Sequence, residues 1–259
     1  MRSDIYHAFT DQLTANLQSD NRVQGLVLLG STAHQNRSPD EWSDHDFFII
    51  TASGAQEDFR TNFDWLPDHD EIVLTIRETE HGLKILYASG HLLEYAVFDL
   101  AEIALAKAND YRVAFDRGGA EAAMQAIATL PTVDTYTSAN LARDMGMFLC
   151  LLVVGAGRVT RGEAISGQVF IRAYAVGHLL SALVHGLQTS EAAQLDNLDP
   201  YRRFERVFPQ IGAEINTALN HDPISAALDL LDVYERHLCE SEAYSEDASS
   251  TVRAFFARL

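Results

Sequence analysis

The sequence predicts an α+β protein, in which an N-terminal domain with a mixed β-sheet and flanking helices is followed by a C-terminal α-helical bundle. Residues 22–117 contain several short apolar runs separated by turn residues, which is typical of β-strands. After about residue 117 the apolar runs become longer and take on helical character. The chain has 259 residues, which is enough for two ordinary domains. We expect these domains at 1–117 and 118–259.

The first domain is expected to begin with a helix. Ile5, Phe9, Leu13 and Leu17 are spaced four apart within residues 4–19, which places them on one face of a helix. Extended segments follow this helix, and glycines mark some of the turns between them. They are predicted at 22–30, 44–51, 71–78, 83–89, 91–100 and 111–116. The last segment can also be the start of the next helix.

The second domain is expected to consist of helices. They are predicted at 120–130, 140–164, 168–187, 224–243 and 247–259. Pro223 suits the first turn of its helix. Cys150 and Cys239 lie in apolar helical surroundings and are expected to be free, buried thiols. His178 and His185 are seven apart on one helix face and are interpreted as core or pocket-wall residues.

Composition restricts the classes of partner. The net charge of −18 disfavours nucleic acid and anionic membranes, because phosphate contacts need clustered lysine and arginine. The same charge tolerates or attracts cationic small molecules, although solubility alone also explains it. We expect no membrane-spanning segment, and the N-terminal residues lack the apolar core of a signal peptide. A cytoplasmic protein with neither a nucleic-acid partner nor a membrane partner is therefore predicted.

The most informative segment is LLGSTAHQNRSPDEWSDHDFFII, residues 28–50. One apolar run ends at Gly30-Ser31, where exposed backbone N–H groups and a hydroxyl can bind a triphosphate. The next apolar run is headed by Asp44 and Asp46, whose side chains point to the same face of a strand. Two like charges there repel each other unless a cation lies between them. Carboxylate oxygens suit Mg²⁺, which shares its ligands with substrate phosphates.

A third carboxylate is usually needed to complete the metal site or to take a proton from the attacking hydroxyl. Glu94, within LLEYAVF, is the preferred candidate because an ionisable residue in an apolar strand needs a reason to be there. Asp99 is the alternative, but capping of the helix that follows explains it more simply. His45 alternates with the two aspartates and is expected to pack rather than to bind metal.

The Gly30-Ser31 turn, the Asp44-x-Asp46 pair and the later strand carboxylate resemble the polymerase-β-like nucleotidyltransferase superfamily. Within it, the chain looks most similar to the two-domain lincosamide and aminoglycoside antibiotic nucleotidyltransferases. RVQGLVLLGS with WSDHDFFII, LLEYAVFDLAEI and GAGRVTRGEAISGQVFI carry the resemblance, which covers most of the chain. It implies that Asp44 and Asp46 hold Mg²⁺, that Glu94 is the catalytic base or a further metal ligand, and that ATP, or another nucleoside triphosphate, binds at Gly30 and Ser31.

The implied activity is transfer of AMP from ATP to a hydroxyl of a small molecule, such as a lincosamide or aminoglycoside antibiotic, with antibiotic resistance as the outcome. Arg161, in the third segment, is a candidate for nucleotide binding, although a helix end capped by Gly162 also explains this stretch. Trp42, in the loop NRSPDEWS, can change which acceptor fits. Two alternatives share the fold: an enzyme that attaches AMP to a protein, and a nucleotide-binding regulatory module without turnover. Family analogy also allows a homodimer.

Overall fold

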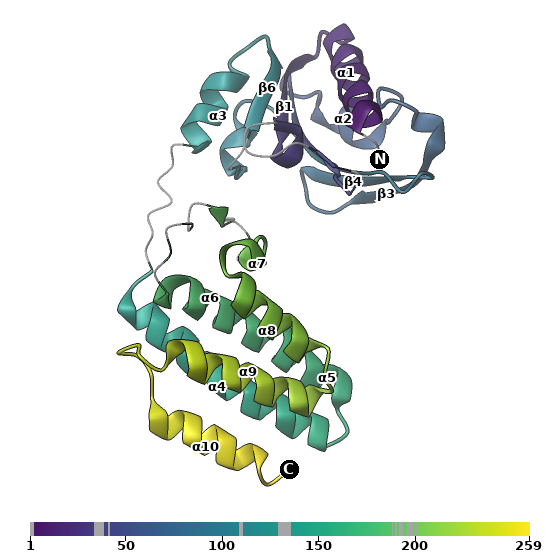
Figure 1. Cartoon of the computed structure of the whole chain (residues 1–259). Coiled ribbons are helices and arrows are strands. Elements are labelled where there is room, and N and C mark those ends of the chain that lie inside the picture. The colour runs from purple at the N-terminus through teal and green to yellow at the C-terminus, as the bar shows by residue number, and fades with distance from the viewer. Residues whose placement is uncertain are drawn as a thin grey trace. The chain divides into compact units, whose positions relative to one another are not determined.

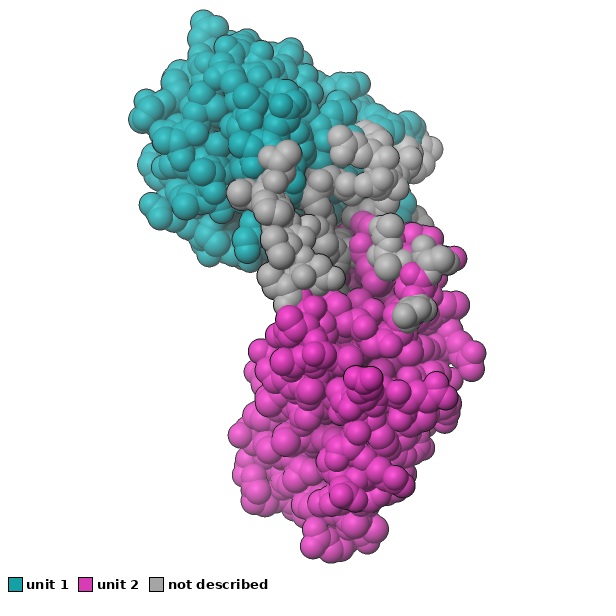
Figure 2. Space-filling view, turned by 90° about the vertical axis from the view of Figure 1, so that its left-hand side faces the viewer, with its two compact units in different colours: residues 1–132 teal, residues 133–259 magenta. Residues whose placement is uncertain are grey.

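The structure is a computed structural model. It describes residues 3–33, 39–40, 42–108, 111–128, 136–187, 189, 191, 194–195, 199 and 201–259. The chain divides into two compact units, Met1–Thr132 and Val133–Leu259, which are coloured separately in Figure 2. The predicted α+β class is confirmed, because the first unit contains a mixed sheet and the described part of the second unit is helical (Figure 1).

The sheet of unit 1 has the strand order β3-β4-β5-β2-β1-β6. The strands are β1 (Val23–Leu29), β2 (His45–Thr51), β3 (Ile72–Arg77), β4 (Gly82–Tyr87), β5 (Leu92–Phe98) and β6 (Tyr111–Asp116). Five of these strands lie within predicted extended segments, whereas β4 begins at Gly82, one residue before its segment. The last segment is a strand rather than the start of a helix. β2 and β5 are parallel, whereas all other neighbours are antiparallel. The first residues of β2 and β5 therefore meet at the same edge of the sheet.

Side chains on the two faces of this sheet enter different cores. On one face, Phe47 and Ile49 of β2 pack with residues of α1 (Ser3–Ser19) and α2 (Gln56–Thr61). On the other face, Ile50 packs with the 3₁₀ helix η3 (Glu102–Leu105) and α3 (Ala120–Ala128). Because α3 packs on the sheet, the division between the units falls after this helix and not at residue 117.

Unit 2 is built around one helical core. Its helices are α4 (Ser138–Thr160), α5 (Ala164–Val169), α6 (Val176–Gly186), α7 (Phe204–Val207), α8 (Pro209–Leu219), α9 (Pro223–Leu238) and α10 (Glu246–Phe256). A π-helical segment, Phe170–Ala175, joins α5 to α6. Pro223 occupies the first turn of α9 as predicted, and the Asp222 side chain caps that helix. The sequence analysis did not predict α2 or α8.

Two features of unit 2 concern expectations from the sequence, and of these only the expected burial of the cysteines is contradicted. The stretches Ser138–Thr160 and Ala164–Gly186 each have 23 residues and mean hydropathies of 1.4 and 1.3, so by length and composition they could cross a membrane. This is weak evidence for a membrane span, because the core helices of soluble proteins meet the same criterion. Cys150 and Cys239 are free but exposed. Cys150 lies on α4 beside the buried Leu149, just outside the stripe that faces the core.

Candidate active site

The Gly-Ser turn lies directly against Asp46. The 3₁₀ helix η1 (Gly30–Ala33) continues from β1, and Gly30 has a φ of +52°, in the left-handed region that favours glycine. A Cβ atom on Gly30 would lie 3.0 Å from Oδ2 of Asp46. The Thr32 hydroxyl donates a hydrogen bond of 2.9 Å to the backbone oxygen of Asp46. The absence of a side chain at Gly30 thus lets the carboxylate rest on the turn.

Tyr6 connects the turn to Asp44. Its hydroxyl donates to the backbone oxygen of Asp44 at 2.6 Å and lies 3.3 Å from Oγ of Ser31. Burial raises the pKa of Tyr6 well above its usual value, and the nearby charges of Asp46 and Asp44 raise it further. Both carboxylates therefore lie close to one phenol.

Tyr6 was not predicted as a site residue, because the four-residue spacing of Ile5 and Phe9 placed Ile5, and not Tyr6, on the buried face of α1. Ile5 is 48% exposed, whereas Tyr6 is fully buried. The available signal was Thr10, which lies one helical turn from Tyr6 and is also buried. Two residues with hydroxyl groups, four apart on one helix, indicate that this face of the helix contacts polar groups. Here these groups belong to Asp44 and His45, at the start of β2.

His45 points away from the two aspartates, so the prediction that it packs is confirmed. It is fully buried, and its ring stacks on that of Tyr6 with a centroid distance of 3.7 Å. Nε2 lies 3.0 Å from the Thr10 hydroxyl, and Nδ1 lies 2.7 Å from Nε2 of His91. Burial lowers the pKa of His45 to about 3 and that of His91 to about 4, because the charged imidazole loses its hydration.

These two pKa shifts predict a loss of stability in acid. Both folded-state pKa values lie below the ordinary value of 6.5, so the unfolded chain binds more protons between about pH 6.5 and pH 4. The free energy of unfolding should therefore fall as the pH drops through this window. We expect His91→Gln to reduce the difference in stability between pH 7 and pH 5 by about 1–2 kcal/mol. Urea unfolding of both proteins at the two pH values measures this.

The exposed His69 provides the control for this experiment. His69→Gln removes an imidazole that is 43% exposed, and it should leave the pH dependence of the wild type in place. If His91→Gln kept the full pH dependence, the buried histidine pair would not be its source.

Glu94 lies beside Asp46 on the neighbouring strand. The parallel register pairs Asp46 of β2 with Glu94 of β5, so their side chains share one face of the sheet. Oε1 of Glu94 is 2.7 Å from Nζ of Lys84, its register partner on β4, and Lys84 is also 3.5 Å from Glu78. Among the residues that the structure describes, no group of three or more His, Cys, Asp or Glu could hold a metal ion. The structure thus brings Asp46 and Glu94 to one face, with Glu94 engaged by a lysine.

Lys84 was not considered from the sequence. The signal was present, because Lys84 alternates with Leu83 and Ile85 in an apolar strand, as Glu94 does in its own strand. Two such residues of opposite charge on consecutive strands suggest a cross-strand pair. By contrast, Asp99 has the predicted capping role. Its Oδ1 accepts 2.9 Å hydrogen bonds from the backbone N–H groups of Ala101 and Glu102, at the start of η3.

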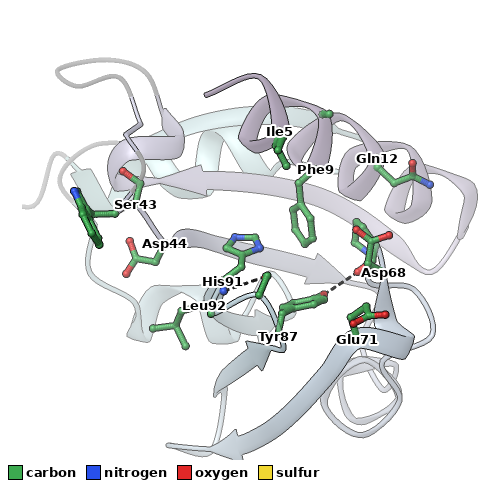
Figure 3. A pocket seen from close by; sticks show the side chains of 15 residues that line it. Ile5, Phe9, Gln12, Ser43, Asp44, Asp68, Glu71, Tyr87, His91 and Leu92 are labelled. Atoms are coloured by element: carbon green, nitrogen blue, oxygen red, sulfur yellow. Dashed lines mark hydrogen bonds between the residues drawn. The ribbon is translucent and has the colours of Figure 1, made fainter. Parts of the chain in front are cut away.

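Asp44 lines a cavity of about 990 Å³ beneath α1 (Figure 3). Its walls come from α1, from the segment before β2, from the β4–β5 turn and from Pro67 to Glu71. Asp44 lies at one end of the cavity, and Asp68 and Glu71 lie at the other, with Phe9 and Tyr87 between them (Figure 3). No lysine or arginine is among the described residues that line it. The cavity is thus acidic and partly aromatic.

Two arginines could contact a phosphate group, and each unit contains one of them. Arg112 of β6, which the sequence analysis did not select, lies 3.4 Å from the backbone oxygen of Thr32 through a guanidinium nitrogen. It places a positive charge next to η1. Arg161 belongs to unit 2, where it ends α4 and pairs with Glu163 at 3.2 Å. Its role in nucleotide binding stays a prediction.

No protein-family model and no curated protein matches the chain. Among solved structures, an aminoglycoside 6-adenyltransferase from Bacillus subtilis is similar at 12% identity, over 96% of this chain and 96% of that chain, with a TM-score of 0.39. A nucleotidyltransferase-like protein from Exiguobacterium sibiricum is similar at 13% identity, over 97% of this chain and 90% of that chain, with a TM-score of 0.29.

Proposed function

We propose that the chain is a magnesium-dependent nucleotidyltransferase that moves AMP from ATP to a hydroxyl group of a small molecule. The observation that carries the proposal is the position of Asp46. Its carboxylate rests on the positive-φ turn at Gly30, and Glu94 lies beside it in the parallel register. An anion-binding turn, a metal-binding carboxylate and a candidate base on one edge of a sheet are the parts that phosphoryl transfer needs.

Asp44 and Asp46 would hold the Mg²⁺ ion. The residues fit this role, because both carboxylates lie near the Tyr6 hydroxyl and supply the hard oxygen ligands that Mg²⁺ prefers. Sites of this kind commonly use one or two carboxylates and complete the shell with water and substrate phosphates. When bound, the ion would neutralise phosphate charge and stabilise the departing pyrophosphate.

The triphosphate would bind at Gly30 and Ser31. The turn offers backbone N–H groups, Ser31 adds a hydroxyl, and the Arg112 guanidinium lies beside the same turn. We retain Arg161 as a proposed nucleotide-binding residue. The chain thus offers both neutral and charged donors to one anion.

Glu94 would take the proton from the acceptor hydroxyl. The ion pair with Lys84 uses Oε1 and orients the carboxylate, so Oε2 can accept the proton. Lys84 already neutralises the negative charge of Glu94, which weakens the attraction of this carboxylate for Mg²⁺. We therefore assign it primarily as the base.

The acceptor would occupy the acidic cavity beside Asp44. The carboxylates of Asp44, Asp68 and Glu71 favour a molecule with positive charges, and Phe9 and Tyr87 provide apolar walls. A hydroxylated cation, such as an aminoglycoside or a lincosamide, has this chemistry. The net charge of −18 supports the same choice. We propose that the enzyme acts in the cytoplasm, where ATP and Mg²⁺ are supplied.

Replacing Gly30 with alanine tests the nucleotide turn. We expect Gly30→Ala to weaken binding of Mg·ATP about tenfold, because the new methyl group displaces the Asp46 carboxylate, and to cost about 1 kcal/mol of stability at the positive φ. Gly54→Ala is a matched control, since Gly54 has a φ of +89° but nothing within 4 Å of its Cβ position. It should lose stability and keep nucleotide affinity. Isothermal titration and urea unfolding measure the two effects, and equal nucleotide affinity in both variants would refute the role of the turn.

The proposed activity is tested with ATP, Mg²⁺ and a panel of aminoglycosides and lincosamides. Pyrophosphate release that depends on one acceptor, with a mass increase of one AMP on that acceptor, is the expected result. Transfer of labelled AMP to protein would instead favour a protein-modifying enzyme. Nucleotide binding without pyrophosphate release in either assay would favour a regulatory module.

A further inference from the structure

Unit 2 contains a pocket of its own, which holds a histidine oriented by a buried carboxylate. The pocket measures about 510 Å³ and lies between α4, the π-helical segment and α6, with Tyr201 at one side. Asp144 is only 3% exposed, and its carboxylate lies against the pocket. A buried charge of this kind needs several hydrogen bonds to be tolerated.

Asp144 has these hydrogen bonds. Oδ2 accepts from the Ser181 hydroxyl at 2.6 Å and from the Tyr136 hydroxyl at 2.8 Å. Oδ1 lies 2.9 Å from Nδ1 of His178 and 3.3 Å from a guanidinium nitrogen of Arg143. These donors hold the pKa of Asp144 below its usual value despite the opposing effect of burial. The carboxylate is therefore ionised and fixed in place.

The orientation of His178 follows from this arrangement. An ionised carboxylate can only accept, so Nδ1 of His178 carries the hydrogen, and in the neutral ring Nε2 is left as an acceptor. The side chain is 27% exposed and lines the pocket. Within the described part of the chain, Nε2 of His178 has no hydrogen-bond partner, and a ligand hydroxyl can supply one.

The backbone around the pocket is irregular in a way that suits a binding site. The π-helical segment Phe170–Ala175 precedes α6, and π-helical turns within helices occur frequently at functional sites. Tyr201 donates to the backbone oxygen of Ala173 in this segment at 2.9 Å. A Cβ on Gly177 would lie 2.7 Å from the Tyr201 hydroxyl, so a larger residue there would displace the tyrosine. The pocket wall is thus built jointly by the π segment, a glycine and a tyrosine.

We propose that this pocket binds an uncharged sugar ring and that Nε2 of His178 accepts a hydrogen bond from one of its hydroxyls. Met147, Leu151 and Tyr174 supply an apolar wall for the ring face. The charge of Asp144 is balanced by Arg143, so the pocket favours neither strong cations nor strong anions. Such a ring is found in the ribose of a nucleoside and in sugar-containing small molecules. The proposal goes beyond the transfer reaction and does not require it.

Binding to the full chain is measured by isothermal titration with adenosine and, separately, with methyl galactopyranoside, as uncharged sources of ribose and of a non-nucleoside sugar. We expect at least one of them to bind, and His178→Asn to weaken that binding about tenfold. Asparagine keeps a donor for Asp144 but has no acceptor at the Nε2 position. His178→Gln can place an acceptor there and should bind more tightly than His178→Asn.

His237→Asn is the matched control, because Nε2 of His237 lies 2.9 Å from Glu214 elsewhere in unit 2. It should bind as the wild type does. Binding of adenosine alone would identify ribose as the source, and binding of methyl galactopyranoside alone would identify the other sugar. The proposal is overturned if neither probe binds, or if His178→Asn binds as well as the wild type does.

Discussion

Asp46→Asn should abolish AMP transfer while leaving the fold intact. Asparagine has nearly the same shape as aspartate, and the backbone oxygen that accepts from Thr32 is unchanged. The substitution removes one negative charge at the turn where the triphosphate and its metal ion would bind. We expect the transfer rate to fall about 1,000-fold or more, which corresponds to ~4 kcal/mol of transition-state stabilisation.

Pyrophosphate release under saturating ATP and Mg²⁺ measures this effect, and thermal unfolding checks that the variant is folded. Asp64→Asn makes the same chemical change at an exposed aspartate between α2 and β3, and it should retain the wild-type rate. Transfer by Asp46→Asn at the wild-type rate would show that the carboxylate is not part of the reaction.

Glu94→Gln should lower the rate constant of transfer about 100-fold to 10,000-fold, because glutamine cannot accept the proton of the attacking hydroxyl. Binding of Mg·ATP should change little if Glu94 acts as the base and not as a metal ligand. The loss of its ion pair with Lys84 should cost at most about 1 kcal/mol of stability, since both side chains are partly exposed. Single-turnover kinetics separate the chemical step from nucleotide binding.

Glu78→Gln is the matched control, because Glu78 is the other acidic partner of Lys84, at 3.5 Å. Its loss perturbs the lysine to a similar degree but removes no proposed base, so the transfer rate should remain within about twofold of the wild type. Equal losses of rate in the two variants would indicate that Lys84, and not Glu94, determines the activity. A large loss of Mg·ATP affinity in Glu94→Gln would instead make Glu94 a metal ligand.

The order of elements was predictable because each depends on local patterning. Short apolar runs between turn residues located the strands, and residues 44–51 were assigned to a strand that the structure places at His45–Thr51. The opposite directions of His45 and Asp46 also followed from alternation along a strand. The helix α2 was missed because its six residues are too short for helical periodicity to register.

The sequence by itself determined which chemical groups are present and which strand ends carry them, because both are properties of neighbouring residues. Only the tertiary structure decided which groups meet. The parallel register of β2 and β5 places Glu94 beside Asp46. The antiparallel register of β4 and β5 pairs Glu94 with Lys84. The helix α1 brings Tyr6 to the turn. Strand order and register bring together residues that are far apart in the chain, and they decide which side chains pair. Local sequence patterns do not encode strand order or register.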